Sequence, residues 1–123
     1  MVMIRDVVFP ADSDELRKLI LEYADWLGID LSYQDFEGEI ASLEALFSPP
    51  SGQYTFAIES FRIAGGVGFR RIDEYTAEVK RLYVRRQYQG KGLGRVLMDN
   101  LLLKLKRMGY TRVVLDAVPP TKK

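Results

Sequence analysis

The chain has 123 residues, 47% of them hydrophobic, and a net charge of +1, so it is long enough for one core but small for two. It contains neither cysteine nor histidine. Their absence excludes disulfides, thiolate nucleophiles, Ser-His-Asp triads and the common zinc sites. We therefore expect a single domain over residues 1–123 that holds no metal.

The charge is unevenly distributed along the chain. Residues 1–60 contain 3 basic and 12 acidic side chains, a net charge of −9, whereas residues 61–123 contain 15 basic and 5 acidic side chains, a net charge of +10. An anionic ligand is therefore expected in the second half. The acidic residues of the first half either attract a cationic amine or form the solvated faces of two helices.

No targeting or membrane segment is expected. The residues after Met1 show no basic stretch followed by an apolar one, and the apolar runs are too short to span a bilayer. The expected location is the cytoplasm.

The first half predicts a strand followed by two helices. Alternating apolar residues predict a strand over Val2–Phe9. The next helix begins with a capping box, in which Asp12 is the N-cap and Glu15 reaches back, and it ends at Gly28. Apolar residues at helical spacing predict the second helix over Tyr33–Phe47.

Three strand-like segments come next, over Tyr54–Glu59, Ile63–Arg70 and Tyr75–Val84. Consecutive strands with short connections favour an antiparallel meander. The middle strand has three glycines between residues 65 and 68. They indicate a bulge or a close approach to a ligand, or they make room for packing, and we favour packing.

A glycine-rich segment then opens a long apolar helix, predicted over residues 91–108. Gly90, Gly92 and Gly94 carry no Cβ, so the backbone can turn sharply and direct several N–H groups at one anion. The helix adds its own unpaired amides and the positive end of its dipole. The segment therefore predicts a phosphate-binding site.

The spacing of the loop distinguishes it from two well-known phosphate sites. A dinucleotide-binding Gly-x-Gly-x-x-Gly needs a glycine where Arg95 stands, and a P-loop needs Ser or Thr after the Gly-Lys pair that ends at Lys91. The positive charges of Lys91 and Arg95 suit a ligand with several phosphates. Gln89-x-x-Gly92-x-Gly94 instead matches the Gln/Arg-x-x-Gly-x-Gly/Ala signature and resembles the GNAT acetyltransferase superfamily.

The likeness continues on both sides of the loop. Ala77–Val84 resembles the fourth strand of these enzymes, Lys91–Met108 their third main helix and Val113–Asp116 their fifth strand. The resemblance implies an α/β fold with a mixed, mostly antiparallel sheet, a parallel splayed strand pair and flanking helices. The helical crossover agrees, because it places the last strand, predicted over Arg112–Val118, parallel to the strand before the loop.

The resemblance also implies that acetyl-CoA is the cosubstrate and that the acceptor is a primary amine of a small molecule or peptide. Backbone groups of Leu82, Tyr83 and Val84 would bind the pantetheine arm and the acetyl carbonyl. The pyrophosphate would be held by Gln89, Gly90, Lys91, Gly92, Leu93, Gly94 and Arg95. Arg85 and Arg86 either bind the ribose phosphate or are solvated, and the loop Gly28–Gln34 lies where the superfamily often contacts the acceptor.

Acetyl transfer to an amine needs a group that takes the proton. Without His or Cys, this is a carboxylate or a water chain. Glu78 is our candidate, because several members of the superfamily carry a glutamate base on this strand. Strand alternation would place Glu78, Lys80, Leu82 and Val84 on one face and Val79, Arg81 and Tyr83 on the other. Glu78 could equally be structural and pair with Lys80, Arg70 or Arg71.

The superfamily usually continues past the fifth strand with a helix and a hairpin, and that helix often carries a tyrosine that protonates the departing thiolate. This sequence ends at Lys123. We therefore expect a piece of a longer protein, a homodimer completed by a second copy, or an acyl-CoA-binding or sensing module without efficient turnover. Nucleic-acid binding is not expected, because the usual basic-aromatic motifs are missing.

Overall fold

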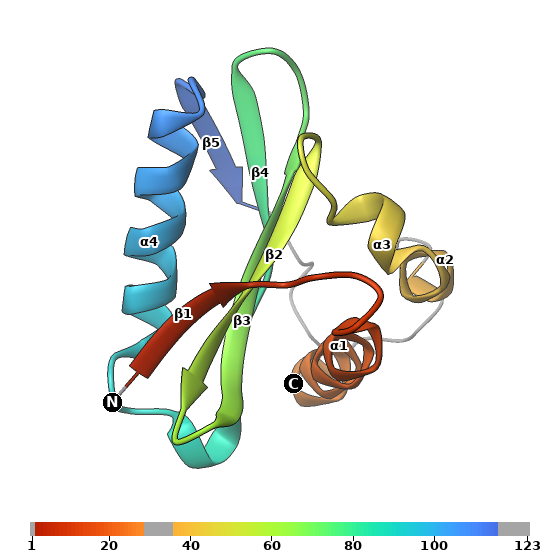
Figure 1. Cartoon of the computed structure of the whole chain (residues 1–123), viewed down its shortest axis with the longest axis vertical. Coiled ribbons are helices and arrows are strands. Elements are labelled where there is room, and N and C mark those ends of the chain that lie inside the picture. The colour runs from red at the N-terminus through yellow and green to blue at the C-terminus, as the bar shows by residue number, and fades with distance from the viewer. Residues whose placement is uncertain (1, 29–35, 116–123) are drawn as a thin grey trace.

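The computed structural model describes residues 2–28 and 36–115, and its elements follow the predicted order (Figure 1). These elements are β1 (Val2–Asp6), α1 (Ser13–Leu27), α2 (Phe36–Ala41), α3 (Leu43–Leu46), β2 (Gly52–Glu59), β3 (Arg62–Arg71), β4 (Thr76–Val84), the 3₁₀ helix η2 (Arg86–Tyr88), α4 (Leu93–Arg107) and β5 (Arg112–Leu115). The strands form one sheet in chain order, antiparallel except for the parallel pair β4 and β5. The predicted mixed α/β fold is confirmed.

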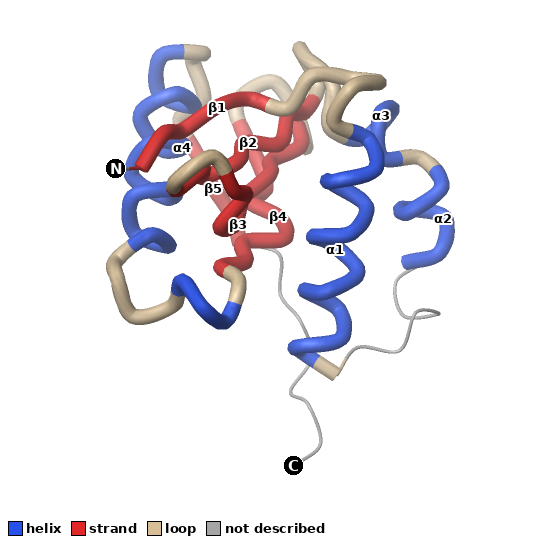
Figure 2. The backbone as a smooth tube through the Cα atoms, turned by 60° about the horizontal axis from the view of Figure 1, so that its bottom comes forward, coloured by secondary structure: helices blue, strands red, loops and turns tan. Residues whose placement is uncertain are grey.

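Two layers of helices enclose the sheet, with α4 on one face and α1 to α3 on the other (Figure 2). On the α4 face, Leu97, Leu101 and Leu105 are buried against small and aliphatic residues of the strands. On the α1 face, Leu16 and Ile20 are buried among aromatic rings. Each fully buried leucine or isoleucine stabilises the fold by about 1.5–3 kcal/mol, so both layers contribute.

The start of α1 differs from the predicted capping box. Asp12 precedes α1, but its side chain accepts no hydrogen bond from the helix. Its carboxylate instead accepts bonds from the Arg5 guanidinium, at 2.7 and 3.1 Å, and from the backbone N–H of Val8, at 2.8 Å. A charge-assisted bidentate pair is stronger than a cap hydrogen bond, and this pair connects α1 to the end of β1. The strand β1 ends at Asp6 and not at Phe9, as was predicted from the sequence. Gly28 ends the helix with φ 72°, as predicted.

The single helix predicted over Tyr33–Phe47 is wrong. The structure has two short helices, α2 and α3, which are separated at Ser42, and residues 33–35 lie outside the described ranges. Ser42 leaves the helical conformation, with φ −123° and ψ 27°, and its carbonyl accepts the first hydrogen bond of α3 from Leu46. Serine favours such helix-start positions, a signal that the regular apolar spacing concealed.

The glycines of β3 make room for aromatic rings. A Cβ on Gly66 would lie 2.3 Å from the Tyr54 ring, and one on Gly68 would lie 2.7 Å from the rings of both Phe47 and Tyr54. Those two rings are buried and meet edge to face at 5.4 Å. The packing interpretation is therefore confirmed for Gly66 and Gly68, whereas Gly65 allows a close approach of the Tyr83 backbone, whose carbonyl oxygen would lie 2.4 Å from a Cβ. The bulge that was the alternative interpretation is present as well.

A bulge interrupts β4 opposite these glycines. Gly66 pairs with Tyr83 and Gly68 with Lys80, so β4 has one more residue than β3 in this interval. Arg81 lies within it, with φ 58°. Such an extra residue shifts the alternation of the strand by one step.

The predicted faces of this strand are therefore wrong. Before the bulge, Val79 packs into the α4 core, and after it Leu82 does so, whereas Tyr83 packs into the α1 core. Glu78, one residue from Val79, consequently lies on the α1 face with Arg81 and Tyr83, and not on the face of Leu82.

At its C-terminal end the described chain keeps the predicted crossover. The helix α4 begins at Leu93, two residues later than predicted, and Gly109 follows its end with φ 98°. The strand β5 pairs with β4 from Thr76–Arg112 to Val79–Leu115. Residues 116–118 of the predicted strand, and with them the predicted splay, lie outside the described ranges. In those ranges no helix is long and apolar enough to cross a membrane.

Candidate functional site

The glycine loop lies between β4 and α4 and has two residues in the left-handed conformation. Gly90 has φ 83°, and Gly92, the N-cap of α4, has φ 81°. An ideal Cβ at either position would have no neighbouring atom within 4 Å. These glycines are therefore required by the turn of the backbone, and the space beside them is open to a ligand.

The amides of this loop point to an anion site. The first hydrogen bond of α4 joins the Val96 N–H to the Gly92 carbonyl at 3.1 Å. Within residues 2–28 and 36–115, no acceptor is recorded for the N–H groups of residues 90–95. Consecutive unpaired amides at the start of a 15-residue helix, together with its dipole, favour a phosphate.

Gln89 holds the loop to the end of β4. Its side-chain amide donates to the Val84 carbonyl at 2.8 Å, and its backbone N–H donates to the Arg86 carbonyl at 3.2 Å. The glutamine of the signature thus holds the glycine loop, the proposed phosphate cradle, against the end of β4. Its predicted direct contact with the pyrophosphate stays a prediction.

The two predicted cations are weakly held. The Lys91 Nζ lies 3.5 Å from a carboxylate oxygen of Glu59 and 5.8 Å from the centre of the Tyr88 ring. The Arg95 side chain is 87% exposed and lies 3.7 Å from Asp99. Surface ion pairs of this kind contribute about 0–1 kcal/mol, so both side chains can turn toward a bound phosphate.

The two arginines predicted as alternatives for the ribose phosphate differ. Arg85 donates to both carboxylate oxygens of Glu22, at 3.0 and 2.9 Å, and to the Ile63 carbonyl, at 3.0 Å. Arg86 is exposed, and no ion pair is recorded for it within the described ranges. Arg85 therefore joins β4 to α1 and β3, while Arg86 is accessible to a ligand.

A pocket of about 360 Å³, which we call the strand-end pocket, opens where the described pairing of β4 with β5 ends. Its lining comes from four elements on both faces of the sheet and consists of Tyr23, Val79, Arg81, Leu82, Met98 and Leu115. Of the three strand residues predicted to bind the pantetheine, Leu82 lines this pocket, and Val84 connects the strand to the glycine loop. The pocket and the loop thus lie at the same end of β4.

Tyr83, the third of these residues, is buried in an aromatic cluster. Its ring lies 6.1 Å from Tyr23 and 5.5 Å from Trp26, measured between ring centres. Burial raises the pKa of the Tyr83 hydroxyl, and the negative charge of Glu22 raises it further. The hydroxyl is therefore protonated at neutral pH.

Glu78 has the contact that its structural interpretation requires. Its carboxylate accepts a hydrogen bond from the Arg70 Nε at 3.1 Å, and the two residues are direct partners across β3 and β4. It is not among the described residues that line the strand-end pocket. Because of the bulge, Glu78 and Leu82 are separated by about three residue steps of the partner strand β3, or roughly 10 Å at about 3.3 Å per residue, so a base at this position would act through water.

The buried ion pair between Glu39 of α2 and Arg81 was not predicted from the sequence. The guanidinium donates to both carboxylate oxygens, at 2.6 and 2.8 Å, and the side chains are only 7% and 2% exposed. Charged residues are rarely buried unless paired, but pairing two residues 42 positions apart requires the fold. The positive φ of Arg81 costs about 1–3 kcal/mol, so this residue is held under strain.

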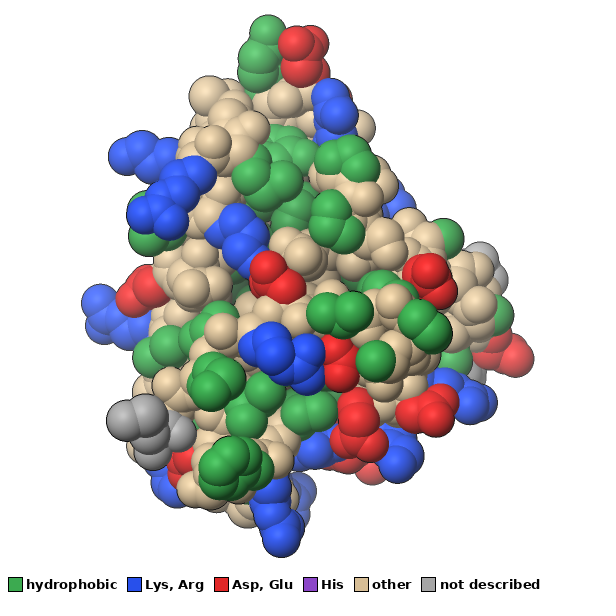
Figure 3. All heavy atoms as spheres, viewed as in Figure 1, with side chains coloured by type: hydrophobic (Ala, Val, Ile, Leu, Met, Phe, Trp, Pro, Cys, Tyr) green, Lys and Arg blue, Asp and Glu red, His purple; other side chains and the backbone are tan. Residues whose placement is uncertain are grey.

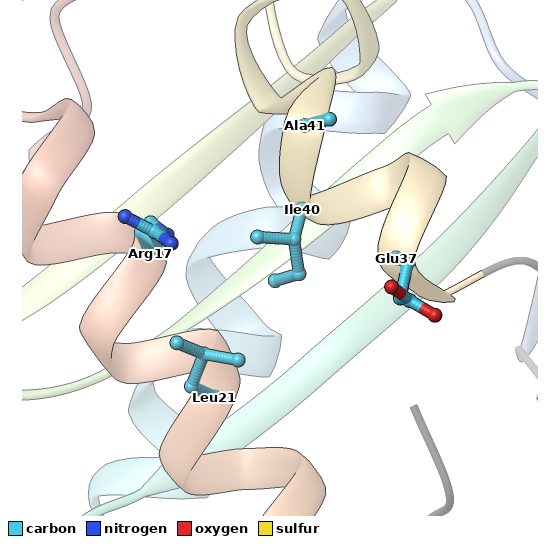
Figure 4. Close-up of a pocket in the computed structure, with 5 residues that line it drawn as sticks. All are labelled: Arg17, Leu21, Glu37, Ile40 and Ala41. Carbon is cyan, nitrogen blue, oxygen red and sulfur yellow. The ribbon is translucent and has the colours of Figure 1, made fainter. Parts of the chain in front are cut away.

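A larger hollow of about 640 Å³ lies between α1 and α2 (Figure 4). Arg17 and Leu21 line it from α1, and Glu37, Ile40 and Ala41 line it from α2. It shares no lining residue with the strand-end pocket. The hollow is therefore distinct from the site on β4. Apart from Gly28, the predicted acceptor loop lies outside the described ranges.

Known proteins are similar to this chain in sequence and in fold. Residues 14–123 match the acetyltransferase (GNAT) family. An uncharacterized N-acetyltransferase of Schizosaccharomyces pombe is 30% identical over 126 residues, which cover 95% of this chain and 73% of the yeast protein.

Two solved structures have the same fold at low sequence identity. A GNAT-family acetyltransferase from Staphylococcus aureus has a TM-score of 0.82 and 21% identity over 96% of this chain and 74% of its own. A protein from Clostridium acetobutylicum described as a predicted acetyltransferase, solved with acetyl-CoA, has a TM-score of 0.81 and 15% identity over 97% of this chain and 82% of its own.

Proposed function

Because the chain belongs to the acetyltransferase (GNAT) family, we propose that it transfers the acetyl group of acetyl-CoA to a primary amine of a small molecule or peptide. One observation carries this proposal. The unpaired amides of residues 90–95 lie at the same end of β4 as the strand-end pocket. A ligand with a diphosphate and a thioester arm would therefore reach the loop and the pocket from the same end of β4.

In this proposal the pyrophosphate accepts hydrogen bonds from the loop amides, while Lys91 and Arg95 neutralise its charge. Backbone groups of Leu82–Val84 bind the pantetheine arm, which enters the strand-end pocket. Acetyl-CoA supplies the activated acyl group, and the protein supplies orientation and the removal of a proton. Backbone binding of this kind makes few demands on side chains.

The neutral amine nitrogen attacks the thioester carbonyl, a C–N bond forms, the C–S bond breaks and CoA leaves as the thiolate. The nitrogen must lose a proton, and we assign its removal to Glu78 through a chain of water molecules. The bulge supports this role, because it places Glu78 on the α1 face together with Arg81 and Tyr83. The ion pair with Arg70 supports the alternative, in which Glu78 has a structural role.

The charge distribution favours a cationic acceptor. Figure 3 shows acidic side chains gathered over α1 and α2, whereas Lys and Arg side chains project along the α4 side. An amine approaching from the α1 side would meet negative potential, which raises its local concentration. Polyamines, aminoglycosides and amino-terminal or lysine-bearing peptides are therefore the acceptor classes to test first.

The test is a panel of polyamines, amino acids, aminoglycosides and peptides, assayed by release of the CoA thiol and by the mass of the product. We expect thiol release that depends on one acceptor class and a product heavier by one acetyl group. Tight binding of acetyl-CoA without release for every amine would contradict the proposal and favour the acyl-CoA-binding or sensing module.

Two further expectations stay predictions, the cytoplasmic location and the homodimer. The structure supports the homodimer expectation, because β5 lies at the edge of the described sheet and its Leu115 is 70% exposed. An exposed strand edge is a template for pairing with another strand. Light scattering on the purified chain tests this expectation.

A further inference from the structure

The bulge in β4 places a non-glycine residue in the left-handed conformation in the middle of a buried strand. Arg81 has φ 58°, and its side chain is almost completely buried. Glycine would adopt this conformation without strain. The surrounding structure must therefore hold Arg81 in place, and the question is which groups do so.

Both ends of Arg81 are fixed by groups from other elements. Its guanidinium forms the two hydrogen bonds with Glu39 of α2, and its Cζ lies 5.7 Å from the centre of the Tyr23 ring of α1. Its carbonyl accepts a hydrogen bond from the Tyr54 hydroxyl of β2 at 2.8 Å. Three elements thus converge on one strained residue.

The two residues that follow Arg81 lie on opposite faces of the sheet. Leu82 follows Arg81 directly and lines the strand-end pocket, and Tyr83 after it turns into the aromatic cluster. If the bulge relaxed into a regular strand, the side chains beyond it would exchange faces. The amide and carbonyl groups offered to the pocket would then change as well.

Stability alone is a weak reason for this ion pair. Removing two charges from water is expensive, and well-packed apolar residues of similar size often stabilise a protein as much or more. A bidentate guanidinium does offer fixed geometry, which neither a lysine nor an apolar side chain reproduces.

We propose that Glu39 and Arg81 are a positioning pair: their buried ion pair fixes the bulge, and thereby orients the backbone of Leu82 and Tyr83 toward the acetyl thioester. The pair connects α2 to the reacting end of β4, so a shift of α2 would reach the site through it. The inference rests on the proposed function for its catalytic consequence. Its structural part, the control of the bulge, does not.

Two variants separate positioning from stability. The double variant Glu39→Leu/Arg81→Met removes both charges and keeps apolar volume. Arg81→Lys keeps the positive charge and removes the bidentate fork. The matched control is Arg5→Met/Asp12→Leu, which removes another bidentate pair, one that joins β1 to the start of α1 and does not involve the glycine loop or the lining of the strand-end pocket.

Thermal melting, the CoA dissociation constant and turnover are measured for each variant. We expect the double variant to melt cooperatively near the wild-type temperature and to bind CoA within about threefold, because the loop amides are untouched. Its kcat should fall by roughly tenfold or more, as should that of Arg81→Lys, since small errors of position are costly. The control should retain wild-type kcat. Wild-type kcat in a folded double variant would overturn the proposal.

A second readout does not depend on activity. In ¹⁵N-labelled wild-type protein, CoA should shift the amide resonances of Leu82 and Tyr83 together with those of Gly92 and Gly94. In the double variant the glycine resonances should still respond, while those of Leu82 and Tyr83 should start from altered positions and respond less. Unaltered Leu82 and Tyr83 resonances would overturn the positioning role, whereas a wild-type protein inactive on every amine would overturn only the proposed function.

Discussion

The two faces of the sheet are built by different means. The α4 face is mainly aliphatic, with leucines at positions 97, 101 and 105 buried over alanine and valine residues of the strands and a single aromatic pair, Phe69 and Tyr110. The α1 face is aromatic and contains the buried Glu39–Arg81 pair. We infer that the two faces have different roles. Backbone amides at the start of α4 bind the cosubstrate, and side chains of the α1 face position the reacting groups.

The largest expected effect comes from breaking the α4 side of this comparison at Gly92. Gly92→Glu places a side chain at φ 81° and a negative charge beside the pyrophosphate, so we expect CoA binding to fall below detection in calorimetry. Unchanged affinity in a folded variant would show that the cradle is elsewhere.

Gly109→Glu is the matched control for strain and charge. Gly109 also has a positive φ, 98°, with no atom within 4 Å of an ideal Cβ, but it lies at the opposite end of α4. We expect this variant to lose stability while its CoA affinity stays within about threefold of the wild type. Equal loss of binding in both variants would mean that unfolding, and not the cradle, explains the first result.

The next effect concerns the α1 face and the role of Glu78. Glu78→Gln keeps the shape and removes the proton acceptor, so kcat should fall by roughly 10²-fold with little change in CoA affinity. Arg70→Gln removes the ion pair but leaves the carboxylate, so it should keep most of the turnover. If both variants lose the same stability and neither loses turnover, Glu78 is structural.

The smallest effect is expected at Asp12, away from both parts of the site. Hydrogen bonding to Arg5 lowers the pKa of this carboxyl. A lowered pKa stabilises the fold above the ordinary carboxyl pKa, and that contribution disappears as the pH falls through the lowered value. Asp12→Asn should therefore lower the free energy of unfolding at pH 7 by about 1 kcal/mol or less, without changing turnover.

Denaturant unfolding of the wild type and Asp12→Asn at pH 7 and near pH 3 checks this dependence. The difference between the two proteins should shrink at the lower pH. An equal difference at both values would show that the charge of Asp12 is not the cause.

The sequence predicted the α4 side well, because its signals are local. Glycine spacing, helical periodicity and a strand on each side place the loop, the helix and the parallel strand without knowledge of the fold. Gly109 has the positive φ that its predicted position at the end of the helix suggested. Such signals lie within a few residues of the feature that they predict.

The α1 side was less predictable, because its determinants are distant in the sequence. Asp12 is drawn from the helix cap by Arg5, and Arg81 is held by Glu39 and Tyr54. Perfect alternation along β4 put Glu78 on the wrong face, because the bulge adds a residue that the local pattern does not reveal. Where tertiary ion pairs outweigh local preferences, the sequence pattern alone misplaces side chains.

The most direct test of the central claim is a titration of ¹⁵N-labelled protein with CoA, followed by amide resonances. We predict that the amides of residues 90–95 and of Leu82 shift first and saturate together, as one bound ligand that spans the cradle and the strand-end pocket. If these resonances stay fixed while those around the α1–α2 hollow, such as Leu21 and Ile40, move instead, CoA binds elsewhere and our account of the site is wrong.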